Sequence, residues 1–279
     1  MGVDAPVEAR LDLVIHARTA MKIVPLIADG KENLWNDCSD HSAFFGEVGA
    51  PLPPVEHLEH IRQRGGEKLA AFDRDQIVGW TGVIPSPDSD DAELAGIEVH
   101  RDYRRQGIAT TLLSSAITWA STRGSRRLNF QTSPLFTANT MLYMRGFNAS
   151  YSWNGNNWAD PERTVPWPTV DCSIEFADTA YRSSIMQGSD LRSQSVLTWT
   201  RFEPEIRRHI GLSGPTFEVM HFPELDLPRV FTELREGNTG LCSTTARVFA
   251  DLAANHYQFR AFESVGNGFY AYVFQRAET

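Results

Sequence analysis

The sequence predicts an α/β fold built around a mixed β-sheet, and three observations carry this prediction. Short β-rich runs separated by turn residues follow one another between residues 67 and 100. Between residues 108 and 176, strand-like runs alternate with two amphipathic helical stretches. A succession of strand, helix and strand requires a crossover connection, so part of the sheet must be parallel.

The first predicted strands form an antiparallel meander. Residues 69–72 and 77–84 are β-rich and are joined by the polar tetrad DRDQ, which predicts a hairpin. The turn-forming residues 87–91 then precede a third strand at 92–100. Upstream, residues from about 18 to 65 are typical of helices and loops.

Two helices flank the next strand. Apolar residues recur with helical spacing from Ile108, and Gly124 is placed to end this helix as its C′ residue. A strand is expected at 126–132. The following helix is expected to begin with Ser133 as N-cap and Pro134 as first residue, and to end at Gly146.

Two further strands, at 147–153 and 170–176, are predicted on either side of a long loop. The tryptophans of this region either line a ligand pocket or cover a domain boundary. They are Trp153, Trp158 and Trp167.

The pattern changes character beyond residue 177, so we predict domains at 1–177 and 178–279. The second domain is expected to be α/β. Its predicted elements are a mostly helical stretch at 181–210, a strand at 216–222, helices around 227–237 and 243–256, and a hairpin at 257–276 that turns at residues 266–268.

The composition is typical of a cytoplasmic protein without nucleic-acid or membrane partners. Acidic residues outnumber basic residues 35 to 26, whereas binding a phosphate backbone requires a basic face. No apolar run approaches the roughly 18 residues of a membrane span, and the first ten residues lack a signal region. The 3 cysteines are far apart without a C-x-x-C pair, so neither a disulfide framework nor a metal site is expected.

One short turn concentrates the features of an anion-binding site. The segment VHRDYRRQGIAT, residues 99–110, joins a predicted strand to a predicted helix and carries three arginines. A helix start presents free backbone N–H groups, Gly107 allows the backbone to approach a ligand, and guanidinium groups pair with phosphate oxygens. The turn is either a helix start with solvated arginines or a pyrophosphate site, and the strand and helix around it favour the pyrophosphate site.

The run AELAGIEVHRDYRRQGIATTLL, residues 92–113, resembles the acetyl-CoA-binding core of the GNAT superfamily of N-acetyltransferases. The family signature is a strand ending in Val, an aromatic-Arg pair, R/Q-x-x-G-x-G/A and a Leu-rich helix. The matching residues are Val99, Tyr103, Arg104, Gly107, Ala109, Leu112 and Leu113. The Gly-Phe at 146–147 also resembles the family pattern, and the likeness covers residues 12–177 in element order and 92–147 in motif detail.

The resemblance implies a V-shaped sheet in which the strands at 92–99 and 126–132 diverge around the pantetheine arm of acetyl-CoA. The cofactor-binding residues that it implies are Ile97, Glu98, Val99, Arg104, Arg105, Gln106, Gly107, Ile108, Ala109, Thr110 and Asn139.

The resemblance also implies catalytic residues for acyl transfer to an amine. Glu93 matches the position of the family's general base, while simple alternation places Glu98 on the opposite face unless a bulge changes the parity. The amide near Val99 is the implied oxyanion donor. In the family, a Tyr that acts as general acid occupies the position of Leu142 in this sequence. Tyr143 is one residue later and can take this role if the helix end is locally rewound.

We therefore expect an acetyl-CoA-dependent N-acyltransferase that acetylates an amine of a small molecule or peptide by direct attack on the thioester. Residues 178–279 are expected to shape the acceptor site or a homodimer interface. The alternatives on the same fold are acyl-CoA decarboxylation, transfer of a larger acyl group and non-catalytic acyl-CoA sensing. His57 and His60 indicate a solvated helix face rather than a metal site.

Overall fold

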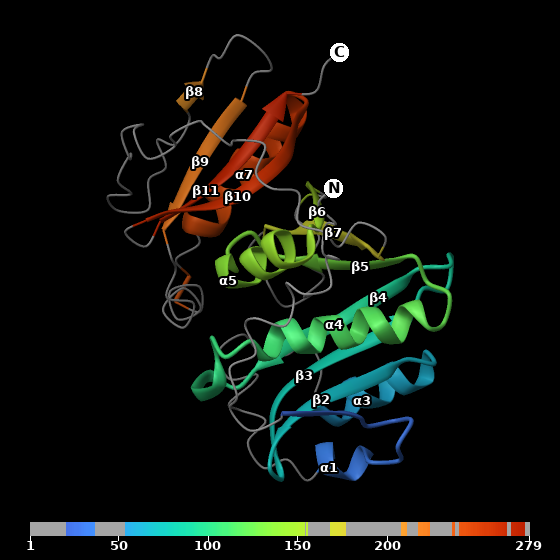
Figure 1. Cartoon of the computed structure of the whole chain (residues 1–279). Coiled ribbons are helices and arrows are strands. Elements are labelled where there is room, and N and C mark those ends of the chain that lie inside the picture. The colour runs from blue at the N-terminus through green and yellow to red at the C-terminus, as the bar shows by residue number, and fades with distance from the viewer. Residues whose placement is uncertain are drawn as a thin grey trace, which may run out of the picture.

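The computed structural model describes residues 21–36, 54–153, 155, 168–176, 208–210, 217–223, 236–237, 240–266 and 269–276. Two β-sheets organise these residues (Figure 1). The first sheet consists, in spatial order, of β1 (Lys22–Pro25), β2 (Glu67–Asp73), β3 (Gln76–Pro85), β4 (Ala92–Val99), β5 (Arg127–Thr132), β7 (Val170–Glu175) and β6 (Ser150–Trp153). The second consists of β10 (Tyr257–Gly266), β11 (Phe269–Arg276), β9 (Phe217–Pro223) and β8 (Arg208–Ile210). The predicted α/β class with a mixed sheet is confirmed.

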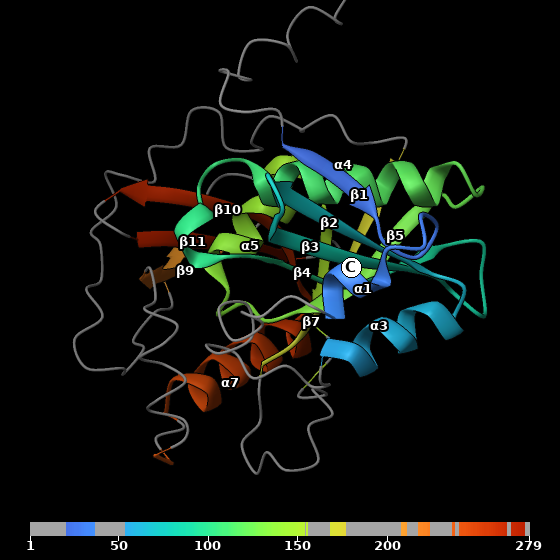
Figure 2. The same ribbon diagram turned by 90° about the horizontal axis from the view of Figure 1, so that it is seen from below.

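Helices cover both faces of the first sheet. They are α1 (Glu32–Asn36), α3 (Pro54–Gln63), the short 3₁₀ turn η2 (Arg101–Tyr103), α4 (Ile108–Ser121), α5 (Thr137–Thr140) and the π-helical turn η3 (Met141–Gly146), while α7 (Gly240–Ala254) belongs to the C-terminal part. Figure 2 shows α4 on one face and α1 and α3 on the other. Two glycines of β3 permit close packing, because a β-carbon at Gly79 would lie 2.9 Å from Ile108 and one at Gly82 would lie 2.6 Å from Ile61.

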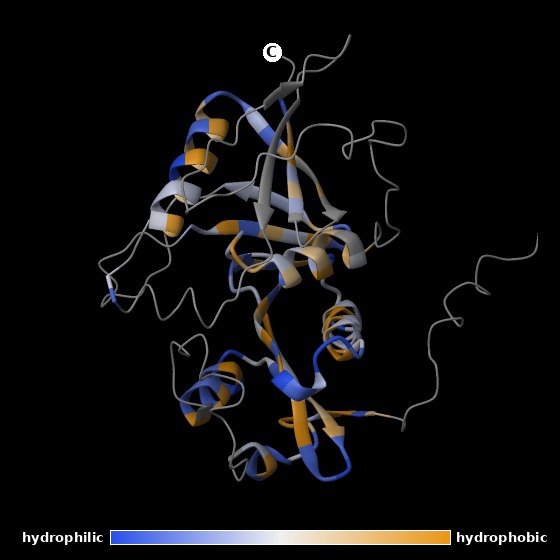
Figure 3. Ribbon diagram, turned by 90° about the vertical axis from the view of Figure 1, so that its left-hand side faces the viewer, coloured by the Kyte–Doolittle hydropathy of each residue, from blue (hydrophilic) through white to orange (hydrophobic). Residues whose placement is uncertain are grey.

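The core lies between the sheet and these helices. Apolar residues form stripes along the helices (Figure 3), as expected for surface helices that bury one face. In α4 the side chains of Leu112, Leu113, Ala116 and Ala120 are completely buried. The helix ends as predicted, with Gly124 just beyond it in a left-handed conformation at φ +87°.

Strands β4 and β5 pair only at their beginning. Their parallel register contains two pairs, Ala92 with Leu128 and Glu93 with Asn129. Asp91, just before β4, joins the two strands at this end, because its carboxylate accepts hydrogen bonds from Arg127 at 3.3 Å and from Asn129 at 3.2 Å, both in β5. Beyond Glu93 the two strands separate, which is the V shape implied by the sequence resemblance.

A β-bulge interrupts β4. Thr81 of β3 pairs with Ile97, whereas Val83 pairs with Leu94, so β4 contains one extra residue between the two pairs. Gly96 lies in this bulge with φ +104°, a conformation that L-residues with side chains rarely adopt.

Two predicted elements begin later than the sequence indicated. The helix expected from Ser133 starts at Thr137, because the Ser133 hydroxyl accepts a hydrogen bond from the Leu135 amide and closes a local turn. The strand expected from residue 147 starts at Ser150, after Asn148 in a left-handed conformation at φ +51°.

Two short strands were missed. β1 lies within residues 18–65, which were expected to contain only helices and loops, and β8 ends the stretch at 181–210 that was expected to be helical. Both have at most four residues, so neither offers enough alternation to be read as a strand. Their order comes from pairing with β2 and β9.

The C-terminal elements pack against the first sheet. Trp153 of β6 contacts Phe249 of α7, with ring centroids 5.5 Å apart. The Tyr272 hydroxyl of β11 donates a hydrogen bond to the Pro134 carbonyl and lies 3.4 Å from the Thr140 hydroxyl. The predicted boundary at residue 178, Trp158, Trp167, the turn residues 267–268, and most of the helical stretches predicted at 181–210 and 227–237 lie outside the described residues.

Candidate functional site

The separated edge of β4 presents backbone groups that β3 does not use. The His100 amide donates to the Val78 carbonyl over 2.9 Å, which fixes the phase of the ladder between β3 and β4. Because bonded and non-bonded pairs alternate in an antiparallel ladder, the amide and carbonyl groups of Val99 and Ile97 point away from β3. They point toward β5 along the stretch where β5 no longer pairs with β4.

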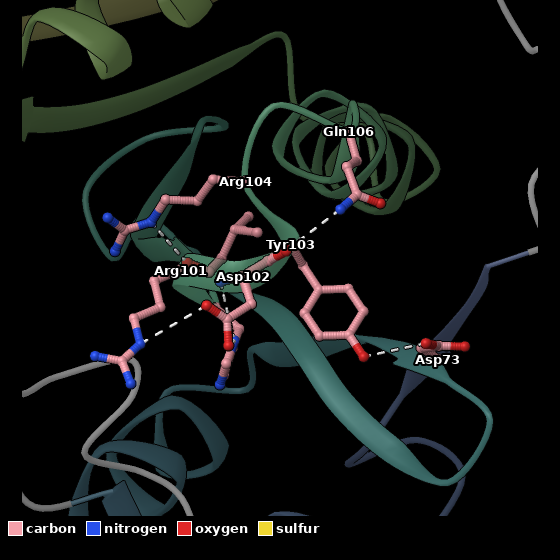
Figure 4. Close-up of polar contacts among 8 residues, drawn as sticks. Asp73, Arg101, Asp102, Tyr103, Arg104 and Gln106 are labelled. Carbon is pink, nitrogen blue, oxygen red and sulfur yellow. Dashed lines mark hydrogen bonds and ion pairs between the residues drawn. The ribbon is translucent and has the colours of Figure 1, made fainter.

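The turn after β4 is held by side-chain contacts on both sides (Figure 4). The Tyr103 hydroxyl donates to the Asp73 carboxylate over 3.1 Å, and this bond raises the pKa of the phenol. The Arg104 guanidinium donates through Nε to the Val99 carbonyl over 3.2 Å. These contacts tie the turn to the hairpin between β2 and β3 and to the end of β4.

The start of α4 has the backbone conformation of an anion-binding turn. Arg105 and Gly107 are both left-handed, with φ values of 62° and 82°, immediately before the first helical residue. No atom lies within 4 Å of a β-carbon built at Gly107, so the surface above this turn is open. The arginine side chains at 101, 104 and 105 are exposed there, and Figure 4 shows Arg101 and Arg104 extending from the turn.

The other predicted cofactor residues lie around the same turn. Gln106 donates to the Asp102 carbonyl over 3.4 Å, and the buried Ile108 side chain anchors the helix against β3. Ala109 is half-buried and Thr110 is exposed in the first turn of α4. The helix start therefore offers its free amides rather than its apolar side chains.

The bulge brings the two candidate carboxylates to one face. Glu93 pairs with Ile84 and Glu98 with Trp80, and these two β3 residues share a face. Simple alternation, which places Glu98 opposite Glu93, is therefore wrong because the bulge adds one residue. Glu93 forms an ion pair with Arg64 at 3.1 Å, with both side chains about one-third exposed.

Tyr143 lies in the core at a rewound helix end. The π-helical turn η3 supplies the local rewinding that the sequence offset required. Its ring packs on Phe130 with centroids 4.5 Å apart, and burial, followed by the nearby Cys172, raises the pKa of the phenol. Asn139, in α5, is half-buried.

Two side chains to which the sequence assigned no role in the site, those of His57 and Thr81, hold the bulge. His57 Nε2 lies 2.9 Å from the Ala95 carbonyl oxygen, and the Thr81 hydroxyl donates to the Gly96 carbonyl over 2.8 Å. The expectation that His57 lies on a solvated face is wrong, because its other ring nitrogen contacts the buried Lys68. The glycine inside the predicted strand was the available signal, since it often marks a bulge.

No helix in the part of the chain that the structure describes is both long and apolar enough to cross a membrane. In the same part of the chain, no three His, Cys, Asp or Glu side chains gather in a way that could hold a metal ion.

Comparison with known proteins defines the class. Residues 33–147 match the model of the acetyltransferase (GNAT) family, so this part of the chain is a GNAT acetyltransferase domain. The match includes the separated strands, the turn and α4 described above.

Curated relatives and solved structures are similar to the chain over part of its length. "Probable N-acetyltransferase 14" of Xenopus tropicalis is 32% identical over 105 residues, which are 37% of this chain and 51% of that protein. "Probable N-acetyltransferase camello" of the same organism is 40% identical over 77 residues, 27% of this chain and 35% of that protein. The chain thus matches about half or less of these relatives.

Among solved structures, the ribosomal-protein-S18-alanine N-acetyltransferase of Escherichia coli superposes with a TM-score of 0.45 at 16% identity, covering 56% of this chain and 93% of that chain. An acetyltransferase of the GNAT family from Staphylococcus aureus superposes with a TM-score of 0.41 at 19% identity, covering 55% and 98%.

Proposed function

We propose that this protein is an acetyl-CoA-dependent N-acetyltransferase that transfers the acetyl group to an amine of a small molecule or peptide. The observation that carries the proposal is the separation of β4 and β5 beyond Glu93, with the backbone groups of Ile97 and Val99 directed into it. An amide-containing arm can pair with such an edge as an added strand does.

The phosphates of acetyl-CoA, the acyl donor, suit the start of α4. Its free amides and the left-handed residues Arg105 and Gly107 suit a pyrophosphate, and the exposed arginines of the turn supply charge. This local basic cluster stands out in a chain whose net charge is −9. In this proposal, acetyl-CoA binds with its phosphates at the start of α4 and its thioester beside β4.

The reaction needs three groups around the thioester. The amine nitrogen forms a bond to the acetyl carbon, the bond from that carbon to sulfur breaks, one proton leaves the amine and one reaches the thiolate. We assign Glu93 as the proton acceptor, the amides of Val99 and Ile97 as donors to the developing oxyanion, and Tyr143 as the proton donor to sulfur. A phenol is protonated at neutral pH, as a proton donor must be, and the raised pKa of Tyr143 makes it a weaker acid than an exposed tyrosine.

Residues 178–279 are proposed as a second domain that shapes the acceptor site or a homodimer interface. The packing of Trp153 on Phe249 supports a fixed contact between this segment and the first sheet. An amine that is cationic before reaction suits the excess of acidic residues.

The test is a screen of an amine library with acetyl-CoA, read by release of free thiol. We expect thiol release that depends on one class of amine and an acetylated product of matching mass. Carbon dioxide released from malonyl-CoA would instead indicate a decarboxylase, and calorimetric binding of acetyl-CoA without turnover would indicate a sensor. Absence of any binding would overturn the proposal.

A further inference from the structure

A chain of contacts connects the interior of the sheet to the bulge of β4. The Lys68 ammonium nitrogen in β2 lies 3.1 Å from Nδ1 of His57, and His57 Nε2 lies 2.9 Å from the Ala95 carbonyl oxygen. The three residues belong to β2, α3 and β4, so the contacts cross from one strand to another through a helix.

The chemistry of the partners fixes the state of the His57 ring. A carbonyl oxygen only accepts, so Nε2 carries the proton and donates to Ala95. Nδ1 then has a lone pair, which accepts from Lys68. Burial, followed by the charge of Lys68, lowers the pKa of His57 to about 3, so the ring is neutral at physiological pH and keeps this arrangement.

Lys68 is held in place by aromatic rings. Its side chain is completely buried, and the ammonium nitrogen lies 3.6 Å from the ring centroid of Trp35 and 3.8 Å from that of Trp80. Lysine is almost never fully buried without such partners. Burial lowers the pKa of Lys68, and the carboxylate of Glu98 opposes this shift.

The contacts at the bulge determine which way its neighbouring amides point. The C=O and N–H groups of one trans peptide point in opposite directions. Thr81 holds the Gly96 carbonyl toward β3, so the Ile97 amide of the same peptide unit points away from β3. His57 holds the preceding carbonyl, that of Ala95, and the two bonds together fix the bulge.

We infer that His57, supported by Lys68, is a positioning residue of the acetyl-transfer site. It fixes the bulge of β4 so that the amides of Ile97 and Val99 meet the thioester carbonyl. The inference rests on the proposed function, because it concerns the same acetyl-CoA site. His57 itself touches the Ala95 backbone and acts through it.

His57→Phe is the informative variant, because phenylalanine keeps a ring where His57 packs on Trp80 at 5.0 Å but removes both hydrogen bonds. His57→Gln is the conservative variant, since its amide can still donate to the Ala95 carbonyl. Leu58→Ala is the matched control. It loosens α3 at the next residue, which is buried, and leaves the His57 contacts in place.

The readouts are kcat, the Kd of coenzyme A, and the infrared carbonyl stretch of bound acetyl-CoA labelled with carbon-13. We expect His57→Phe to lower kcat by about 10- to 100-fold, as small misplacements do, with the Kd of coenzyme A within about threefold of wild type. The carbonyl stretch should move toward that of free acetyl-CoA. With His57→Gln, kcat and the carbonyl stretch should both stay close to their wild-type values. Leu58→Ala should lower the stability of the protein and change neither quantity.

Lys68→Met gives an independent measurement if the phenylalanine variant does not fold. Methionine keeps the apolar stem between the two tryptophans and removes the donor. We expect a smaller loss of kcat in the same direction. Where His57→Phe folds, combining it with Lys68→Met should give no further loss, because both changes act on one set of contacts.

Two outcomes are distinguishable. A wild-type protein that does not bind acetyl-CoA overturns the proposed function and the inference with it. A wild-type protein that turns over acetyl-CoA, with His57→Phe or Lys68→Met leaving kcat and the carbonyl stretch unchanged, overturns the inference alone.

Discussion

Gly96 of β4 lies against the indole of Trp80 in β3, where a β-carbon would be only 2.9 Å from ring atom Cη2. This contact, with φ +104° at the glycine, explains why the bulge needs glycine on both steric and conformational grounds.

Gly96→Ala should therefore destabilise the domain by about 1–3 kcal/mol, the usual cost of a strained backbone. Chemical denaturation measures the change. Gly30→Ala is the control, because Gly30 is left-handed at φ +63° with no atom within 4 Å of its β-carbon, and it should cost only about 1 kcal/mol. Equal losses in the two variants would show that the Trp80 contact is unimportant.

Gly107→Glu should abolish binding of coenzyme A, because it places a carboxylate beside the helix start proposed to hold the phosphates. Gly124→Glu is matched to it. Both glycines flank α4, both are left-handed, at φ 82° and 87°, and both have open space around the β-carbon. Each variant should lose about 1 kcal/mol of stability from backbone strain. Calorimetric titration with coenzyme A should show loss of affinity only at Gly107, and comparable affinities would remove the phosphates from this turn.

The state of His57 should also set how stability depends on pH. Its folded-state pKa of about 3 lies below the ordinary value of 6.5, so between these values the unfolded chain binds more protons. The free energy of unfolding should therefore fall as the pH decreases below about 6.5, by roughly 2–3 kcal/mol on reaching pH 4.5.

Urea denaturation at pH 7.5 and pH 4.5 measures this slope. His57→Gln should reduce the difference between the two pH values, whereas His60→Gln, exposed in the last turn of the same helix, should keep it. Equal slopes in wild type and His57→Gln would contradict a neutral, half-buried His57 ring.

The sequence predicted the meander, the crossover helix α4 and the turn between β4 and α4, because each has a local signal: alternation, helical periodicity, or arginines beside a glycine. It did not predict the contacts of Lys68 and His57. These contacts join residues of β2, α3 and β4 that are distant in the sequence. No local pattern predicts that a lysine is buried between two tryptophans. The shared face of Glu93 and Glu98 also depends on one extra residue in β4, which Gly96 alone could signal.

Tyr143→Phe should lower kcat by about 100-fold if the phenol protonates the departing thiolate, which is the lower end of the typical contribution of general acid catalysis. Packing on Phe130 is retained, so stability should change little. Tyr151→Phe is the control, because Tyr151 is also buried but packs on Phe259 of the C-terminal sheet. Similar values of kcat for the two variants would show that Tyr143 is a core residue without a catalytic role.

Glu93→Gln tests the proposed general base, and the ion pair with Arg64 provides its control. Loss of a base should lower kcat by about 10²–10⁴ while the Kd of coenzyme A stays the same. Arg64→Met breaks the same 3.1 Å ion pair but leaves the carboxylate, and because both groups are partly exposed it should cost at most about 1 kcal/mol of stability. Glu98→Gln shows which of the two carboxylates on this face is the base. If Arg64→Met slows turnover as much as Glu93→Gln does, the ion pair rather than proton transfer explains the loss, and if only Glu98→Gln is slow, the base is Glu98.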